Sequence, residues 1–369
     1  MVEAYLLWAP ALHSTASMIQ TTMTPADAGA SPVCTIEPLA DHAEWDAFVN
    51  AAAGGTFAHL SGWRAIFRDV MRHPTTYLAA RDANGTLAGV LPLVEFRSRL
   101  FSSRVISVPY LNDGGPLGGD GAIRSLTAAA QTLSADLGGP LELRYRKGPA
   151  PDDGDARKVT VLLDLPENPD TLWKRLPSKL RSQVRRPQKA GMTTRFGLDE
   201  LPAFYRVWSR NMRDLGTPVL PYRFFEAAAA SFPDRFMVGC VYTADTPVAA
   251  GAGFLFRGEF EITWASSLRE YNRDAPNMLL YWAFMEHVIA QGATVFNFGR
   301  CTPGEGTHRF KLQWGGESVP LHWRVTPAEE SGDSGPGRLA RAGSAAWQRL
   351  PVSVANAIGP LVARQLPWW

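Results

Sequence analysis

Residues 236–256, FMVGCVYTADTPVAAGAGFLF, decide the fold of this chain. They read as two β-strands joined by a short polar turn. A third strand-like run, EFEITWASSL, follows at 259–268. After it come an apolar helical segment at 278–293 and a short β-run at 294–300. The pattern therefore predicts antiparallel strands, then a helix, then a final strand.

The same order of elements occurs earlier in the chain. Residues 76–96 read as two strands joined by the turn DANG at 82–85, and 104–109 read as a third strand. A helical segment at 123–139 and a β-run at 141–146 complete the pattern. The two copies lie about 155–160 residues apart, which favours a duplicated domain. Chance similarity between two ordinary α+β domains is the alternative.

Length and charge limit the classes of protein to consider. A chain of 369 residues is about two domains long. Its 37 basic and 35 acidic residues leave a net charge of +2, so it is no polycationic nucleic-acid coat. Three widely spaced cysteines favour a reduced, cytoplasmic protein over a disulfide framework, and no zinc-binding motif occurs. No apolar run is long enough to span a membrane.

The predicted fold class is α/β (α+β), with a mixed, largely antiparallel sheet in each domain. We place the first domain at 34–164 and the second at 165–326. Residues 1–33 are predicted to be a disordered leader, and 327–369 a linker followed by a basic, apolar tail. Arginines flank an apolar stretch in this tail, which ends in Pro-Trp-Trp, as is typical of a membrane-surface segment. Packing of the tail on the second domain is the alternative to peripheral contact with the inner membrane.

Positive charge is concentrated in residues 173–198, which contain no acidic residue. Arg181 and Arg185 share one helical face, and Lys189 lies four residues further on. Pro187 should kink or end this helix, because it lacks an N–H and clashes one turn back. Guanidinium groups pair with phosphate oxygens, so we predict a phosphate or nucleic-acid contact here. A solvated basic face is the alternative.

A second informative segment, NFGRCTPGEGTHRFKLQWGGES, covers 297–318 and follows the second helix. Arg300 lies at the end of a strand, and a short helix is expected over 308–314. Phe310 would face the core. Lys311 would point toward the strand end, where it could hold phosphate or stabilise charge on the carbonyl oxygen of a reacting ester. An exposed surface ammonium is the alternative for Lys311.

Other reactive side chains are less informative. Asp113 lies in the Gly-rich loop VPYLNDGGP at 108–116, where it could be a carboxylate in a cleft, although turn chemistry alone explains its presence. Cys301 and His308 could be a nucleophile and its base. Spacing in sequence carries no geometry, however, and a buried thiol at the strand end is favoured for Cys301.

Several motifs carry a family resemblance. KLRSQVRRPQKAGM at 179–192 opens the second copy and GTHRFKLQWGG at 306–316 closes it, while TFAHLSGW at 56–63 and VPYLNDGGP mark the first copy. The order of strands and helix in the second copy resembles the acetyltransferase-like (GNAT) fold. Two such copies with these motifs resemble the FemAB family over residues 34–325. More narrowly, the chain resembles the FemAB-like proteins of exosortase/PEP-CTERM exopolysaccharide systems.

The resemblance implies two tandem GNAT-like domains and an acyl- or aminoacyltransferase. Characterised FemAB proteins move an amino acid from aminoacyl-tRNA onto the amine of a peptidoglycan precursor. Phe310 and Lys311 match the Phe-Lys pair that lies at the tRNA-acceptor end of the family's active site. The implied donor is a charged tRNA or an acyl-CoA, with no tightly bound cofactor and no metal. The implied acceptor is an amine or hydroxyl of a cell-envelope or exopolysaccharide precursor.

These inferences give one hypothesis for the site. Lys311 and Asp113 are the predicted catalytic residues, with Asp113 as a base. The predicted substrate-binding residues are Arg181, Arg185, Lys189, Phe310 and Arg300. Acetyl-CoA users carry a Gly-rich pyrophosphate loop where this chain has no glycine, at 268–280, which favours a non-catalytic ligand-binding protein as the alternative. A general nucleic-acid-binding protein is a third alternative, against which the small net charge speaks.

Overall fold

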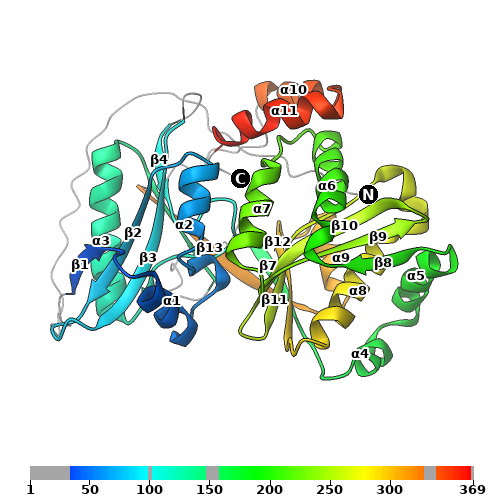
Figure 1. The fold of residues 1–369 in the computed structure, drawn as a ribbon, viewed down its shortest axis with the longest axis horizontal. Coiled ribbons are helices and arrows are strands. Elements are labelled where there is room, and N and C mark those ends of the chain that lie inside the picture. Colours follow the sequence, from blue (N-terminus) through cyan, green and yellow to red (C-terminus); the bar gives the residue numbers. More distant parts are fainter. Residues whose placement is uncertain (1–33, 99–101, 147–157, 328–337, 367–369) are drawn as a thin grey trace.

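The structure is a computed structural model that describes residues 34–98, 102–146, 158–327 and 338–366 (Figure 1). The predicted leader, 1–33, and most of the predicted linker lie outside the described residues. The strands form one sheet that runs through both domains, in the order β1-β2-β3-β4-β6-β13-β7-β12-β11-β10-β9-β8, with β5 paired to β3.

The first domain has the predicted order of elements. Antiparallel strands precede helix α3, and β6 then pairs parallel to β4. The predicted turn at 82–85 joins β2 to β3, and Gly85 adopts a φ of 79° there. The elements are β1 Thr35–Pro38, α1 His42–Ala51, α2 Trp63–Ala65, β2 Thr75–Arg81, β3 Leu87–Phe96, β4 Arg104–Ile106, β5 Leu117–Gly118, α3 Asp120–Leu137 and β6 Leu141–Tyr145. Short 3₁₀ and π turns, Phe57–His59 and Ile66–Val70, flank α2.

The second domain repeats this order, with helices inserted before its strands. Strands β8 to β11 are antiparallel, α8 follows, and β12 pairs parallel to β11. The elements are β7 Lys158–Asp164, α4 Pro169–Arg175, α5 Ser178–Lys189, β8 Thr193–Phe196, α6 Leu201–Asp214, α7 Tyr222–Ser231, β9 Phe236–Thr243, β10 Thr246–Phe256, β11 Glu259–Ser267, α8 Pro276–Ile289, β12 Val295–Cys301, α9 Gly306–Leu312 and β13 Glu317–Thr326. The predicted α/β fold class is confirmed.

Strand β13 joins the two domains into one sheet. Its first half, Glu317–Leu321, pairs with β7, and its second half, His322–Thr326, pairs with β6. Strand β7 pairs in turn with β12 of the second domain. The predicted boundary between the domains, at residue 165, assigns β7 to the first domain. In the structure β7 pairs with β12 of the second domain. This exchange ties the two domains together by backbone hydrogen bonds.

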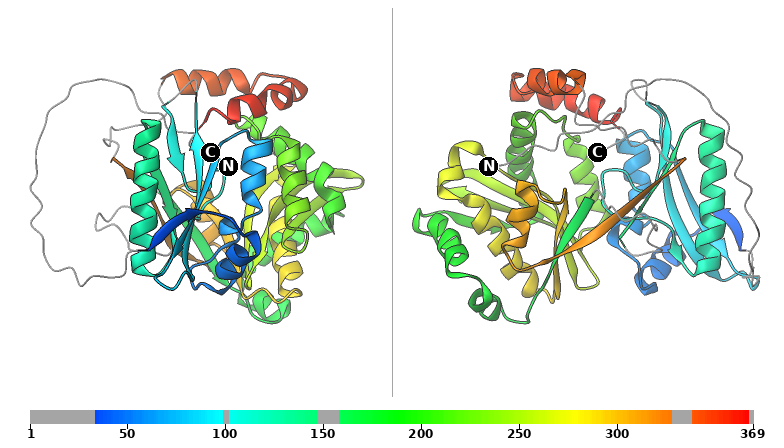
Figure 2. Two further views of the ribbon diagram at one scale, coloured as in Figure 1. Left: turned by 60° about the vertical axis from the view of Figure 1, so that its left-hand side comes forward. Right: turned by 180° about the vertical axis from the view of Figure 1, so that it is seen from behind.

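Helices cover the sheet on both faces (Figures 1 and 2). In the second domain α8 covers one face with α5 packed on it, and α6 covers the other face. An aromatic core lies between the first domain and α7, where Trp63 packs against Phe224 and Phe232 with ring centroids 5.8 and 5.1 Å apart. Because this core is shared, burying it fixes the first domain against the second.

Two helix predictions need correction. Helix α5 does not end at Pro187 but continues to Lys189. The proline lies so near the C-terminus that little helix remains to be disrupted, and its ring is buried. The helix expected over 308–314 is α9, which begins two residues earlier, at Gly306, and ends at Leu312.

The tail folds into two helices, α10 Arg338–Trp347 and α11 Val352–Ala363, which pack on the rest of the protein. Helix α11 lies against α6, and the guanidinium of Arg364 donates to the Val70 carbonyl of the first domain at 2.9 Å. The side chain of Arg213 on α6 donates to the Leu350 carbonyl at 2.8 Å. Within the described residues, none of the helices has the length and apolarity needed to cross a bilayer.

Candidate active site

The site forms where β11 and β12 diverge. The two strands pair in parallel only over a short stretch, where Glu259–Glu261 of β11 lies beside Val295–Asn297 of β12. Beyond this point β12 is irregular between Asn297 and Arg300, where it pairs with β7. Gly299 has a φ of 70°, and a Cβ there would lie 2.9 Å from the Ile262 carbonyl oxygen. A glycine is therefore required, and the irregularity turns β12 away from β11.

Side-chain alternation gives this part of the sheet two different faces. One face is apolar and packs on α8. Its members from β11 and β12 include Phe260, Ile262, Phe296 and Phe298. The opposite face carries Glu259, Glu261 and Asn297 and is directed toward the first domain, since Glu261 binds Asn112. The strand divergence therefore separates an apolar, helix-covered side from a polar, interdomain side.

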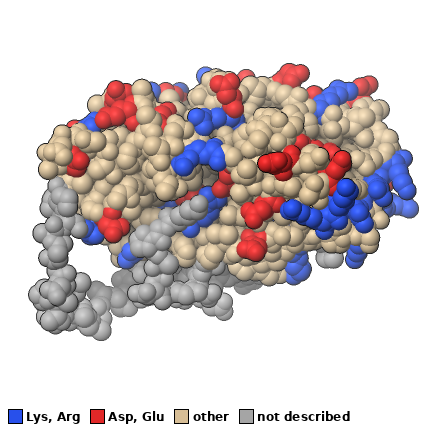
Figure 3. All heavy atoms as spheres, turned by 90° about the horizontal axis from the view of Figure 1, so that it is seen from below, with Lys and Arg blue, Asp and Glu red and all other residues tan. Residues whose placement is uncertain are grey.

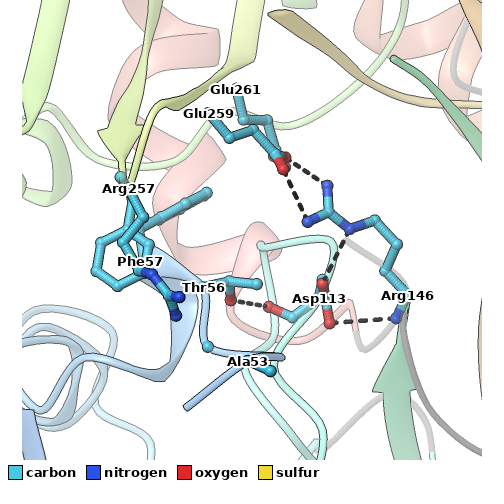
Figure 4. Close-up of a pocket in the computed structure, with 10 residues that line it drawn as sticks. Ala53, Thr56, Phe57, Asp113, Arg146, Arg257, Glu259 and Glu261 are labelled. Atoms are coloured by element: carbon cyan, nitrogen blue, oxygen red, sulfur yellow. Dashed lines mark hydrogen bonds and ion pairs between the residues drawn. The ribbon is translucent and has the colours of Figure 1, made fainter. Parts of the chain in front are cut away.

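A pocket of about 150 Å³ lies on the polar side, between the two domains (Figure 4). The first domain lines it with Ala53, Gly55, Thr56, Phe57, Asp113 and Arg146, and the second with Phe256, Arg257, Glu259 and Glu261. Three carboxylates face two guanidinium groups here. The pocket is thus more acidic than basic, and it suits a ligand that brings a positive charge.

Arg146 holds two of these carboxylates in place. Its Nη2 donates to Glu259 at 2.9 Å, and its Nη1 bonds the other oxygen of the same carboxylate. Its Nε lies 3.5 Å from Asp113, whose carboxylate also accepts from the Arg146 backbone N–H at 3.3 Å. Figure 4 shows Arg146 between the two acids. Asp113 therefore lies in the pocket, as a carboxylate in a cleft, and is engaged with Arg146.

Glu261 is the acid whose proton affinity is most altered. One carboxylate oxygen accepts from Asn112 Nδ2 at 2.8 Å and the other from Asn297 Nδ2 at 3.1 Å. Burial raises the pKa of Glu261 to about 7, with a further contribution from the negative charge of Glu259, while Arg146 and the Asn112 hydrogen bond oppose the rise. A carboxylate that titrates near neutrality is suited to general base catalysis.

The amide of Asn297 has only one possible orientation. Its Oδ1 accepts from the Gly299 N–H at 2.9 Å and from the Thr160 hydroxyl. Its Nδ2 must therefore point to the carboxylates, and it donates to Glu259 at 2.8 Å as well as to Glu261. The irregular segment of β12 thus fixes the position of Glu261 through this one side chain.

Lys311 lies on α9, and its ammonium group reaches the same strand divergence. It is 5% exposed, which excludes a surface ammonium. Its Nζ donates to the carbonyls of Gly299 and Arg300 at 2.7 and 2.8 Å. Burial lowers the pKa of Lys311 to about 8, although the charge of Glu261 acts in the opposite direction. An ammonium has three donors, so one remains beyond the two backbone bonds.

Phe310 and Arg300 lie on either side of Lys311. Phe310 contacts Tyr281 on α8 edge to face, with ring centroids 5.0 Å apart. The guanidinium of Arg300 lies 4.7 Å from the centre of the Trp323 ring, whose indole N–H donates to the Asn112 carbonyl. Arg300 is therefore close to the interdomain side, whereas Phe310 belongs to the apolar side.

The basic helix α5 lies apart from the pocket. Arg181 is half-buried and Arg185 and Lys189 are exposed. The Arg185 guanidinium lies 5.2 Å from the centre of the Trp173 ring. None of the three lines the pocket, and α5 packs on α8. Figure 3 shows Lys and Arg side chains gathered at this end of the molecule. They share the α8 side of the sheet with Lys311.

In the first domain a buried arginine lies close to the point where the corresponding strands, β4 and β6, stop pairing. β4 and β6 are in register only at Val105–Ile106, as in the second domain. Fully buried Arg144 occupies the space beyond, where it donates to Glu142 at 2.8 Å and to the Leu111 carbonyl at 2.7 Å. Its guanidinium also lies 4.0 Å from the Trp323 ring centre. Side chains therefore fill the first divergence.

The start of α8 does not provide a phosphate cradle. The preceding 3₁₀ turn, Arg269–Asp274, contains no glycine, and Ala275 adopts a φ of 55°. Pro276 is the first helical residue and has no N–H to offer. Among the described residues, no cluster of His, Cys, Asp and Glu could hold a metal ion.

Comparison with known proteins agrees with this architecture. The family described as an acetyltransferase (GNAT) domain matches residues 174–312. A search of curated proteins found no match. Among solved structures, FemX is 13% identical with a TM-score of 0.58, and the match covers 78% of this chain and 95% of FemX. The fold is that of two GNAT-like domains in tandem.

Two further structures support the tandem arrangement. L-PGS from Bacillus licheniformis is 12% identical with a TM-score of 0.50, and the match covers 86% of this chain and 97% of that protein. A tandem GNAT protein from the clavulanic acid biosynthesis pathway is 14% identical with a TM-score of 0.50, covering 80% and 100%. At such identities the likeness concerns the fold. It does not bear on the exosortase association, which stays a prediction.

Sequence reasoning found Asp113 but missed the other two acids of the pocket, Glu259 and Glu261, and their partners. Glu259 and Glu261 alternate along an otherwise apolar strand, which places both on one face, and this was a usable signal. Arg146 and Asn297 gave no such signal, because their role depends on contacts between distant segments. Lys158 was also missed. It lies near the end of β12, where its Nζ donates to the Thr302 hydroxyl at 2.7 Å.

Proposed function

We propose that this protein is an acyl- or aminoacyltransferase that moves an activated acyl group onto an acceptor amine held between the two domains. The observation that carries the proposal is the pair formed by Glu261 and Lys311. These two buried groups have pKa values displaced toward neutrality, and both bond to the irregular part of β12, Glu261 to the Asn297 amide and Lys311 to the carbonyls of Gly299 and Arg300.

The acceptor is an amine that enters the interdomain pocket. When Glu261 is ionised, above its pKa of about 7, the pocket holds three carboxylates against two guanidinium groups and attracts the ammonium form of an acceptor. Arg146 holds Glu259 and Asp113 in fixed positions, whereas Glu261 is free to titrate near neutrality. We assign Glu261 as the general base and Asp113 as a residue that positions Arg146.

The donor approaches from the α8 side, where Lys311 and the basic residues of α5 lie. We propose that Arg181, Arg185 and Lys189 contact phosphates of the carrier, with Arg300 and Phe310 nearer to the acyl group. The start of α8 lacks glycine and begins with Pro276, so it is poorly suited to a pyrophosphate. This favours a charged tRNA over an acyl-CoA as the donor.

The chemical step follows from these positions. The bound ammonium first loses a proton through Glu261 to solvent. The neutral nitrogen then attacks the carbonyl carbon of the donor ester, and a carbon–nitrogen bond forms while Glu261 takes the second proton. The remaining donor of Lys311 stabilises the negative charge on the carbonyl oxygen. The bond to the carrier oxygen breaks, and that oxygen takes the proton from Glu261.

The acceptor that fits the FemAB resemblance is a cell-envelope or exopolysaccharide precursor. The fold that this chain shares with FemX supports the resemblance from which this acceptor is inferred. A non-catalytic binding protein on the same fold is the second possibility, favoured only by the missing glycine loop at the start of α8.

The test is a panel of donors and acceptors. Radiolabelled charged tRNAs and acyl-CoAs are each offered to the full chain with a soluble peptidoglycan precursor and with simple primary amines. We expect transfer from charged tRNA and a loss of about 10²–10³-fold in rate for Lys311→Ala. Arg124→Ala, which removes an exposed basic side chain on α3 of the first domain, is the control. Binding of a donor without transfer to any acceptor would favour the non-catalytic protein.

A further inference from the structure

Helix α11 differs from an ordinary surface helix in which of its side chains are buried. Its buried face is made of the small residues Ala355, Gly359 and Ala363, spaced one turn apart. A Cβ at Gly359 would lie 2.8 Å from the Val219 side chain, so the helix approaches its neighbours closely. An amphipathic helix of a soluble protein normally buries its large apolar side chains instead.

Three large apolar side chains of α11 lie on its outer face. Val354 is 41% exposed, Ile358 is 38% exposed and Leu361 is 61% exposed. The spacing of four and then three residues places them in one stripe along the helix. They are three of the five large apolar side chains that are exposed in the described part of the chain. An exposed apolar stripe of this kind marks a surface that contacts a partner or a membrane.

Charge indicates which occupant fits. Residues 338–369 contain four arginines and no acidic residue. Exposed Arg349 lies in the connection between α10 and α11, and Arg364 fastens the end of α11 to the first domain. An apolar stripe in a segment whose charged side chains are all arginines complements an anionic lipid surface. The sequence continues after α11 with two tryptophans, a residue type enriched at membrane–water interfaces.

The dimensions favour a helix that lies in the plane of the interface. Helix α11 has 12 residues, so it is roughly 18 Å long, well short of the ~30 Å hydrocarbon core. In Figures 1 and 2, α10 and α11 lie side by side along one edge of the molecule, outside the sheet. A flat membrane surface can therefore reach them without displacing either domain.

We propose that the outer face of α11 docks this protein on an anionic bilayer. The stripe of Val354, Ile358 and Leu361 inserts below the headgroups, while Arg349 contacts acidic headgroups. Because the inner face of α11 stays packed on α6, docking requires no unfolding of the tail. The proposal concerns location and is independent of the transfer reaction.

The test is flotation of the full chain with vesicles of phosphatidylcholine that contain about 30% phosphatidylglycerol, an anionic lipid. We expect binding that weakens in 0.5 M salt and with pure phosphatidylcholine, by about tenfold or more. Val354→Ser/Ile358→Ser/Leu361→Ser should lower partitioning at least ~10-fold, because its apolar contacts with the lipid are lost. Leu198→Ser is the matched control, since Leu198 is 38% exposed, as is Ile358.

The substituted side chains are exposed, so the triple variant should unfold at the same temperature as the original protein. Equal flotation of the original protein and the triple variant would overturn the proposal, as would failure of the original protein to bind anionic vesicles. Light scattering after size-exclusion chromatography tests the other occupant, a second copy of this chain. A dimer that the triple variant abolishes would show that a second copy covers the stripe, which also overturns the proposal.

Discussion

Replacing Glu261 by glutamine should change the pH dependence of stability. Its carboxyl has a pKa of about 7 in the folded protein, against an ordinary value of 4.5. Folding therefore favours the protonated form, and the folded state loses stability as pH rises from 4.5 through 7. A displacement of this size corresponds to about 3 kcal/mol at pH 8. Glutamine cannot ionise, so the variant escapes this loss.

A constant offset accompanies this change. Both oxygens of Glu261 accept from Asn112 and Asn297, and the amide NH₂ of glutamine would face one of these donors. That mismatch costs about 1–3 kcal/mol at every pH. The prediction therefore concerns the slope. Between pH 5 and 8 the free energy of unfolding of Glu261→Gln should rise relative to that of the original protein by about 2.5 kcal/mol.

Urea unfolding followed by tryptophan fluorescence at half-unit steps of pH measures this difference. Glu167→Gln, which removes an exposed carboxylate in the loop before α4, is the control for the loss of one acid. A difference between Glu261→Gln and the original protein that stays constant from pH 5 to 8 would refute the assignment of a near-neutral pKa to Glu261.

Two further predictions concern the donor side and the strand divergence. Charge reversal, Arg181→Glu/Arg185→Glu, should raise the KM for charged tRNA and make that KM depend less steeply on salt, because fewer phosphates are neutralised. Kinetics at about 50–200 mM salt measure this change, and an unchanged salt dependence would exclude α5 from the donor site. Gly299→Ala should destabilise the fold by about 1–3 kcal/mol in thermal unfolding, because its φ of 70° and the 2.9 Å approach to Ile262 both disfavour a Cβ, and an unaltered melting temperature would contradict this packing.

The buried charges explain why this region holds its shape despite an electrostatic penalty. Glu261 and Lys311 are each displaced toward their neutral forms by burial. Neither is left alone, since Glu261 accepts two amide bonds and Lys311 donates to two carbonyls. Burial of the aromatic core between the domains stabilises the fold and offsets the cost of burying these two groups.

The sequence was informative about local elements and less so about pairing. The order of strands and helices in each copy follows from alternation and turn chemistry, as the 82–85 turn shows. The split pairing of β13 between β6 and β7 could not be predicted, because it joins segments more than 150 residues apart and leaves no local signal. The end of α5 was misplaced because the penalty for Pro187 falls where few backbone bonds remain.

The site was predicted only in part, because local sequence patterns identify some of its residues but not their contacts with distant segments. Lys311 could be selected because the short helix that carries it has its own pattern of glycines and aromatic residues. Asp113 was selected as a carboxylate in a loop, and it lines the pocket. The near-neutral acid is Glu261, and its environment depends on Asn112 and Asn297, which lie far from it in the chain. Such convergence is set by tertiary structure.

The most direct test of the account is the single-turnover rate of transfer from charged tRNA to a primary amine as a function of pH. With Glu261 as base and Lys311 as the cationic stabiliser, the rate should rise with pH through about 7 and fall above about 8. Glu261→Gln should lack the rising limb while the falling limb remains. A rising limb of the same midpoint in the variant would show that another group accepts the proton and would contradict the central claim.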